Sequence, residues 1–227
     1  MEAEKKQFIR SFFYPVLFVI ILWLIKALDL IFDLNLSEYG LYPLKIKGIP
    51  GIFTAPFLHA DISHLFANSI PLIVLGALLF YFYRDIAWLI MLLLYLITGL
   101  WVWTFARGNG VHIGASGIIY GLASFLFLSG IIRREKGLMV LTLLVTFLYG
   151  GLIWGLMPQL FPAQHISWES HLMGLLAGFI LAIYYRNSGP QRIRYDWEEE
   201  DDDNGEYQDP SPPSGIDAEI TDHPSKD

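Results

Sequence analysis

Residues 114–132 read GASGIIYGLASFLFLSGII, and this stretch decides the fold. It is apolar and close to the length of about 20 residues that a helix needs to cross a bilayer. Polar and small residues stand at its start, with Ser116 among them, and Arg133 and Arg134 follow its end. A hydroxyl at the end of a membrane helix needs a partner, because an unpaired polar group is unfavourable in hydrocarbon.

Five more stretches along the chain share this apolar character. Together the six predicted spans are 11–32, 64–83, 86–105, 115–132, 138–157 and 167–185. Only 16% of the 227 residues are charged, against about 25% in an average soluble domain. The sequence therefore predicts an all-α polytopic membrane protein, a bundle of six transmembrane helices. The absence of cysteine excludes disulfides, zinc thiolates and a cysteine nucleophile.

Charge divides the chain into three parts. Residues 187–227 hold 13 acidic residues against three basic ones, with Pro212, Pro213 and few apolar anchors. This composition predicts a disordered acidic tail, which is either a docking segment or a solvated end. Residues 11–186 form the predicted membrane domain, and residues 1–10 precede it. The body carries no basic stripe of the kind that binds nucleic acid, so no nucleic-acid partner is expected.

Lysine and arginine predict the orientation of the spans. With the N-terminus in the cytoplasm, ten basic residues fall on the inner side and only Lys45, Lys47 and Arg107 on the outer side. Because basic residues favour the cytoplasmic side, both termini are predicted to be cytoplasmic. Lys26 falls within the first span, where it snorkels or faces the bundle, and a functional charge is the less favoured interpretation. The outer loop 33–63 is amphipathic and is expected to lie in the interface or to pack on the bundle.

Two polar residues occupy matching positions in this topology. Ser116 and His171 each lie near the outer end of a span, and both of these spans run from outside to inside. Glycines follow each of them at small-xxx-small spacing, which lets two helix backbones approach closely in lipid. The glycines lie in two segments, Gly117 with Gly121 and Gly174 with Gly178. Taken singly, such a serine often bonds its own helix, and such a histidine is often only interfacial.

A third polar group precedes the second span. His64 and Asn68 are four residues apart and share one helix face at its outer end. They are either donors to a tetrahedral intermediate or an interhelical hydrogen-bonded pair. Asp61 is predicted to cap the helix that follows it. Elsewhere, Glu169 is interpreted as interfacial, and His112 and His165 as solvated loop residues.

These motifs closely resemble those of the rhomboid intramembrane serine proteases. The chain has His64-x-x-x-Asn68, Gly114-x-Ser116-Gly117 and His171-x-x-Gly174-x-x-x-Gly178 in the family's order. Like many members it also has His59 before the first motif and Tyr120 after the second. It departs from many bacterial members because residues 34–58 contain neither Trp nor Arg, which leaves the lipid contacts of that loop open.

The resemblance implies a Ser–His dyad. Ser116 would be the nucleophile and His171 the general base, with His64, Asn68 and the Ser116 backbone N–H as oxyanion donors. Tyr120 would hold the His171 ring, and His59 would support the site. The remaining implied positions are packing glycines, namely Gly114, Gly117, Gly121, Gly174 and Gly178.

The implied activity is cleavage of single-span membrane proteins near the outer face of a bacterial plasma membrane, with neither metal nor cofactor. The alternatives are a catalytically inactive rhomboid-like protein that binds membrane clients, and a small transporter or channel. A transporter would require ionisable residues at mid-depth in several spans, and the spans hold almost none beyond Lys26.

Overall fold

The computed structural model describes residues 2–107, 110–134, 136–148 and 167–189 of the chain. The regular elements in these ranges are all helical, which confirms the predicted all-α class. The long helices are α1 (Glu2–Phe32), α3 (Ile62–Phe82), α4 (Ala87–Phe105), α5 (Ser116–Arg133), α6 (Lys136–Leu148) and α8 (Trp168–Tyr184). Four short helical segments lie between α1 and α3: η1 (Leu36–Tyr39), η2 (Ile46–Gly48), α2 (Gly51–Thr54) and η3 (Ala55–Phe57).

Several of these helices are suited to a bilayer. Among the described residues, α1, α3, α4 and α5 are long and apolar enough to cross a membrane, and α8 is a shorter apolar helix. The chain is therefore a multi-pass membrane protein. The fifth predicted span, 138–157, is described only as far as Leu148 in α6, so its second half lies outside the described residues. The predicted acidic tail lies outside them from residue 190 onward.

The helix limits follow local sequence signals. α1 begins at Glu2, well before the apolar stretch at residue 11. Glu2 and Glu4 in its first turn interact favourably with the positive end of the helix dipole, which lets the helix extend beyond its apolar part. α3 begins after Asp61, whose Oδ1 accepts the His64 N–H at 2.7 Å. The predicted N-cap is thus confirmed.

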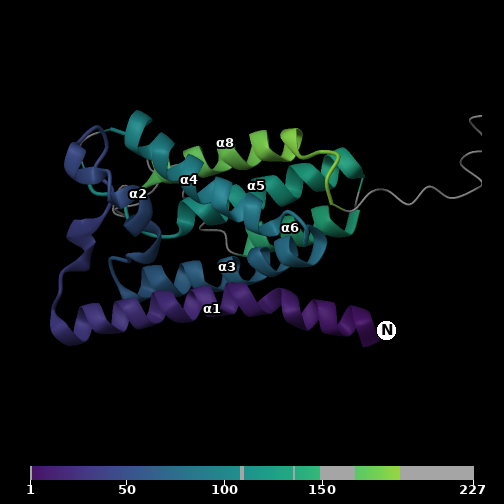
Figure 1. Ribbon diagram of the computed structural model, residues 1–227, viewed down its shortest axis with the longest axis horizontal. Helices are drawn as coiled ribbons and strands as arrows, with labels where there is room; N and C mark the ends of the chain where they lie inside the picture. Colours follow the sequence, from purple (N-terminus) through teal and green to yellow (C-terminus); the bar gives the residue numbers. More distant parts are fainter. Residues whose placement is uncertain (1, 108–109, 135, 149–166, 190–227) are drawn as a thin grey trace, which may run out of the picture. The chain divides into compact units, whose positions relative to one another are not determined.

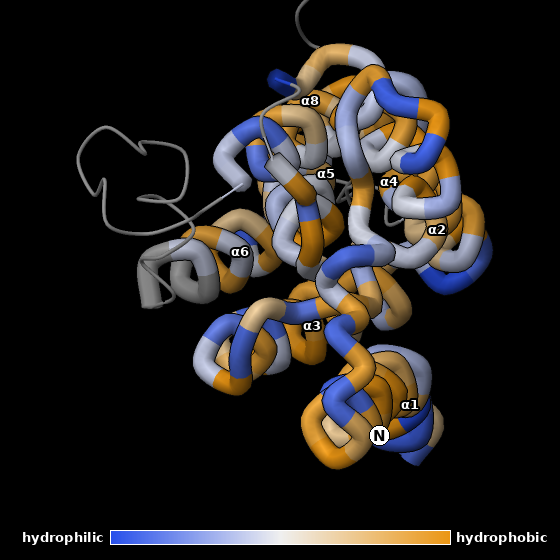
Figure 2. Tube along the Cα trace, turned by 90° about the vertical axis from the view of Figure 1, so that its left-hand side faces the viewer, coloured by the Kyte–Doolittle hydropathy of each residue, from blue (hydrophilic) through white to orange (hydrophobic). Residues whose placement is uncertain are grey.

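Helix α5 lies at the centre of the helices. In an 18-residue window of α5, 72% of the residues are buried, against 22% in α1 and in α4. Figure 1 shows α8 on one side of α5 and the α3–α1 layer on the other, and the end-on view in Figure 2 shows the same order. Large side chains such as Leu24 of α1 and Trp88 of α4 are exposed. An apolar surface of this kind suits contact with lipid tails.

Helices α1 and α3 pack closely along their length. A Cβ at Gly76 of α3 would lie 2.9 Å from Pro15 Cγ of α1, so the glycine lets the two helices approach. Further along, the indole N–H of Trp23 donates to Ser69 Oγ at 3.0 Å. This apolar and hydrogen-bonded contact holds α1 against the helix that carries His64 and Asn68.

The loop between α1 and α3 packs on the bundle, which is one of the two arrangements predicted for it. The N–H of Leu44 donates to the Trp103 carbonyl of α4 at 2.9 Å, and the Trp103 indole donates to the Lys45 carbonyl at 3.0 Å. Leu41 forms a two-way backbone pair with His112, at 3.0 and 2.8 Å. The loop is therefore joined both to α4 and to the segment that leads into α5.

Candidate functional site

Ser116 is the first residue of α5, and a glycine turn places it there. Gly114 has φ +107°, a backbone conformation that residues with a side chain rarely adopt. Its N–H donates to the Ala55 carbonyl at 2.8 Å, which joins the turn to η3. The Ser116 side chain thus stands at the start of a buried helix, next to a backbone of restricted geometry.

The structure brings Ser116 and His171 into hydrogen-bond contact. Ser116 Oγ lies 2.8 Å from His171 Nε2, between α5 and the first turn of α8. Both residues are buried, at 8% and 6% exposure. When the serine hydroxyl donates, Nε2 is the unprotonated nitrogen and can take up the proton. This is the geometry that a nucleophile and its base require.

Tyr120 lies one turn after Ser116 and stacks on the His171 ring. The ring centroids are 4.2 Å apart and the planes differ by 11°. Because a buried, face-to-face neighbour restricts rotation of the imidazole, Tyr120 can hold Nε2 toward Ser116.

Close contact between α5 and α8 depends on their glycines. A Cβ at Gly174 would overlap the Gly117 carbonyl, and a Cβ at Gly178 would overlap the Gly121 carbonyl. Nearby, Ser124 Oγ of α5 donates to the Leu175 carbonyl of α8 at 2.9 Å. The two backbones are therefore as close as glycine permits, and this closeness lets short side chains such as Ser116 and His171 meet.

His64 and Asn68 reach the same end of α5 from α3. A Cβ at Gly114 would lie 2.9 Å from His64 Nε2 and 3.5 Å from Asn68 Nδ2. Both side chains are thus close to the turn two residues before Ser116. An imidazole N–H and an amide N–H at this position are suited to stabilise negative charge that develops on a substrate oxygen.

His59 supports Asn68 from the segment before α3. Asn68 Nδ2 lies 3.0 Å from His59 Nε2, and the His59 and His64 rings are in edge contact with centroids 5.1 Å apart. Burial and, to a smaller extent, the neighbouring His64 together lower the pKa of His59 to about 3. His59 is therefore neutral and accepts one Asn68 amide hydrogen, which leaves the second hydrogen for another acceptor.

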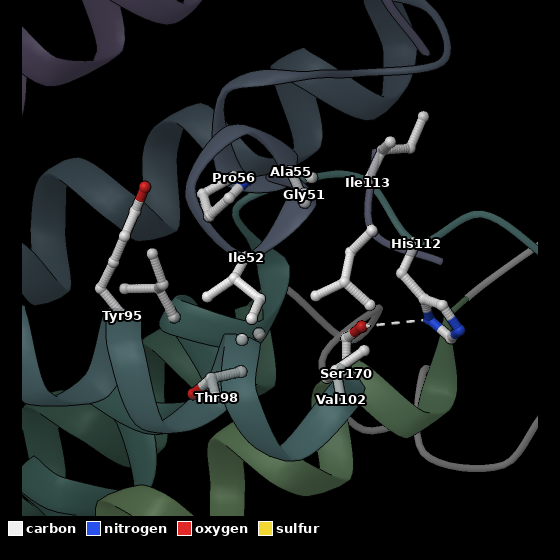
Figure 3. Close-up of a pocket in the computed structure, with 15 residues that line it drawn as sticks. Gly51, Ile52, Ala55, Pro56, Tyr95, Thr98, Val102, His112, Ile113 and Ser170 are labelled. Carbon is white, nitrogen blue, oxygen red and sulfur yellow. Dashed lines mark hydrogen bonds between the residues drawn. The ribbon is translucent and has the colours of Figure 1, made fainter. Parts of the chain in front are cut away.

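His112 is buried, so its interpretation as a solvated loop residue is wrong. It is 7% exposed, and burial lowers its pKa, whereas the nearby Glu169 raises it. Its Nδ1 bonds Ser167 Oγ and lies 3.4 Å from Ser170 Oγ, directly before His171 (Figure 3).

With its backbone pair to Leu41, His112 joins three segments. Composition carried no signal for this role, because the contacts are distant in sequence. The other loop histidine, His165, lies outside the described residues.

Replacing His112 by alanine should lower the thermal stability of the protein. The variant loses the side-chain contacts to the start of α8, and each such hydrogen bond contributes about 1 kcal/mol. A scan of the purified protein in detergent should show a lower unfolding temperature than the control Val111→Ala, a change at the exposed neighbouring residue. Equal unfolding temperatures for the two variants would contradict this role.

A pocket adjoins the Ser116 turn on the side of α4 (Figure 3). Its lining includes Thr98, His112, Gly114, Gly117 and Ser170. Thr98 Oγ1 is buried and has no hydrogen-bond partner within the described ranges. The pocket is thus mainly apolar, with Ser170 and His112 among the few polar residues on its wall.

Glu169 also lies in the first turn of α8, and its interpretation as an interfacial residue stays a prediction. Its Oε1 is 3.8 Å from Arg107 Nε, and the Arg107 guanidinium lies 5.3 Å from the Trp168 ring. The Arg107–Glu169 pair is separate from the Ser116–His171 contact, and because the Arg107 side chain is 72% exposed the pair contributes little to stability.

Comparison with known proteins gives one consistent similarity. A family model described as "Rhomboid domain" matches residues 48–188, more than half of the chain. An uncharacterized protein of Mycobacterium tuberculosis is 37% identical over 187 residues, covering 77% of this chain and 74% of the relative. An uncharacterized Mycobacterium leprae protein is 34% identical over 180 residues, covering 77% and 70%. The Arabidopsis thaliana RHOMBOID-like protein 1 is 31% identical over 142 residues, covering 59% and 34%.

Proposed function

The chain belongs to the rhomboid family, and from that membership and its site we propose that it is an intramembrane serine endopeptidase. The observation that carries the proposal is the 2.8 Å contact between Ser116 Oγ and His171 Nε2, buried between two apolar helices. A serine hydroxyl is a weak nucleophile, and an adjacent imidazole activates it by accepting its proton.

The proposed reaction passes through an acyl-enzyme. Ser116 Oγ attacks the carbonyl carbon of a peptide bond, and its proton moves to His171 Nε2. The tetrahedral intermediate collapses as the C–N bond breaks, and His171 gives the proton to the leaving amine. A water molecule then attacks the ester with His171 again as the base, which releases the new carboxylate and restores Ser116.

The intermediate carries negative charge on the former carbonyl oxygen. His64, Asn68 and the Ser116 backbone N–H are the proposed donors to this oxyanion, since both side chains lie against Gly114. The pocket beside Gly117, with Thr98 and Ser170 on its wall, supports a route for the water that hydrolysis consumes.

Six spans with both termini in the cytoplasm are the proposed topology, supported by the distribution of basic residues. In that arrangement Ser116 and His171 lie near the outer face. The proposed substrates are therefore single-span membrane proteins, cut near that face where the helix can unwind locally to expose a peptide bond. A bacterial plasma membrane is the proposed location.

An inactive client-binding protein is the second candidate function. Such a protein has no need of a serine and a histidine in contact, nor of two donors beside them. The presence of Ser116, His171, His64 and Asn68 in one place favours the enzyme.

Covalent labelling tests the proposal without knowledge of the natural substrate. The full chain in liposomes is treated with a serine-reactive fluorophosphonate, and the labelled peptide is identified by mass spectrometry. Labelling on Ser116, together with cleavage of a single-span reporter, is the expected result. No labelling of Ser116 and no cleavage of reporters with varied sequences would favour the client-binding alternative.

Asn68→Ala should slow the reaction while leaving substrate binding almost unchanged. Loss of one oxyanion donor lowers kcat by about 10²- to 10³-fold, because the donor acts mainly in the transition state. Reporter kinetics should therefore show the change in kcat and a similar KM. Ser69→Ala is the matched control, since it removes the neighbouring side chain that bonds Trp23. An equal loss of kcat in both variants would contradict an oxyanion role for Asn68.

A further inference from the structure

A buried ion pair lies in α1, outside the proposed catalytic groups. Lys26 Nζ is 2.8 Å from Asp29 Oδ2, and the two residues are only 6% and 9% exposed. Ionisable side chains inside a membrane helix are unfavourable unless they are paired, and they often mark functional positions. Here each member has a further partner, so the pair belongs to a larger hydrogen-bonded arrangement.

These further partners lie in the segments that follow α1. Lys26 Nζ donates to the Ala60 carbonyl at 3.1 Å, and Asp29 Oδ1 accepts the Leu36 N–H at 2.9 Å. Asp29 thus holds the Lys26 side chain in place. It also holds the start of the outer loop against the end of α1. Lys26 in turn holds the backbone of the residue directly after His59.

The contacts continue from Ala60 to the proposed oxyanion site. His59 lines the same small pocket as Lys26 and Asp29. Its Nε2 is 3.0 Å from Asn68 Nδ2, and Asn68 lies against Gly114. A continuous set of contacts therefore joins Asp29, Lys26, the 59–60 backbone and Asn68.

The packing of α1 against α3 does not depend on this ion pair. Pro15 packs on Gly76, and Trp23 bonds Ser69, so the two helices are joined at other points. A buried ion pair is also a weak source of stability, because removing two charges from water offsets most of their attraction. The Lys26 ammonium, however, donates a hydrogen bond to the Ala60 carbonyl, which an apolar side chain at this position could not do.

We propose that Lys26 and Asp29 are positioning residues that hold His59 so that it orients the Asn68 amide toward the oxyanion. This inference rests on the proposed protease function. His59 accepts one Asn68 hydrogen, and the second hydrogen then points toward the substrate oxygen. Lys26 fixes the backbone beside His59, and Asp29 fixes Lys26.

The test uses the full chain in liposomes and the variant Lys26→Met/Asp29→Leu. Both charges are removed, so no unpaired charge remains in the helix and the unfolding temperature should stay close to that of the wild type. Because the Ala60 carbonyl loses its donor, kcat should fall by about 10- to 100-fold, as expected for a small misplacement of a catalytic group. KM should change little.

A double-mutant cycle with Asn68 separates positioning from a general structural effect. In an Asn68→Ala background, the Lys26→Met/Asp29→Leu change should have almost no further effect on kcat, because the group that it positions is gone. Trp23→Phe is the matched control. It removes an α1–α3 hydrogen bond three residues before Lys26 without touching the 59–60 segment, and it should retain wild-type kcat.

Two outcomes would overturn this inference and leave the proposed protease function intact. Wild-type kcat in the Lys26→Met/Asp29→Leu variant is one, and a full, independent loss of kcat in the Asn68→Ala background is the other. A wild type that neither cleaves the reporter nor labels at Ser116 would instead overturn the proposed function, and this inference with it.

Discussion

Replacement of Ser116 by alanine is expected to abolish cleavage of a single-span reporter, with a loss of kcat of at least about 10⁴-fold. The change removes the hydroxyl oxygen that forms the proposed acyl-enzyme, and the neighbouring N–H donors cannot replace it as a nucleophile. Fluorophosphonate labelling should disappear in the same variant. The unfolding temperature should stay near that of the wild type, since alanine fits the same buried space.

His171→Ala should cause a loss of similar size. Without the base, the Ser116 proton has no acceptor at 2.8 Å. Because the two residues act as one unit, the double variant should be no less active than either single variant. Ser129→Ala is the control, since Ser129 is another buried serine on α5, and its hydroxyl has no hydrogen-bond partner within the described ranges. Cleavage that survives both Ser116→Ala and His171→Ala would exclude the dyad.

Gly174→Val is expected to have the second largest effect, and it acts through packing. A Cβ at this position would overlap the Gly117 backbone, so α8 must move away from α5. Overpacking of this kind typically destabilises a protein by about 1–3 kcal/mol. Since Ser116 and His171 lie on these two helices, the displacement should also break their contact. Reporter cleavage and fluorophosphonate labelling should both be lost.

The control for this variant lies on the same helix. Leu176 is exposed, so Leu176→Val introduces the same β-branched side chain without a clash. It should retain activity and an unfolding temperature near that of the wild type. Wild-type labelling of Gly174→Val would show that the close approach of α5 and α8 is not needed for Ser116 reactivity.

Local sequence features were sufficient to predict much of the fold. Hydropathy predicted where α3, α4, α5 and α8 lie to within a few residues, because a membrane helix needs a continuous apolar run. Asp61 predicted the start of α3 through its capping side chain. Helical spacing placed Ser116 with Tyr120, and His64 with Asn68, since residues four apart share a helix face.

The contacts between distant segments could not be predicted in the same way. The sequence marks Lys26 as an unusual residue within a span, but its hydrogen bond to the Ala60 carbonyl depends on how α1 packs on the next segment. The sequence predicts His112 to be a solvated loop histidine, because backbone pairing with Leu41 leaves no mark in composition. Such contacts are set by tertiary packing, for which periodicity carries no information.

The lengths of the helices have a consequence for the surrounding lipid. At 1.5 Å per residue, α8 with its 17 residues spans about 26 Å, less than the roughly 30 Å of a hydrocarbon core. Lipid chains beside its exposed residues, such as Ile180, must shorten or tilt to match it. Such a mismatch draws the headgroup regions toward both ends of a short membrane helix, and His171 lies at one end of α8. We expect a bilayer thinned in this way to shorten the distance that water must travel to reach Ser116, which contacts His171 at this end of α8.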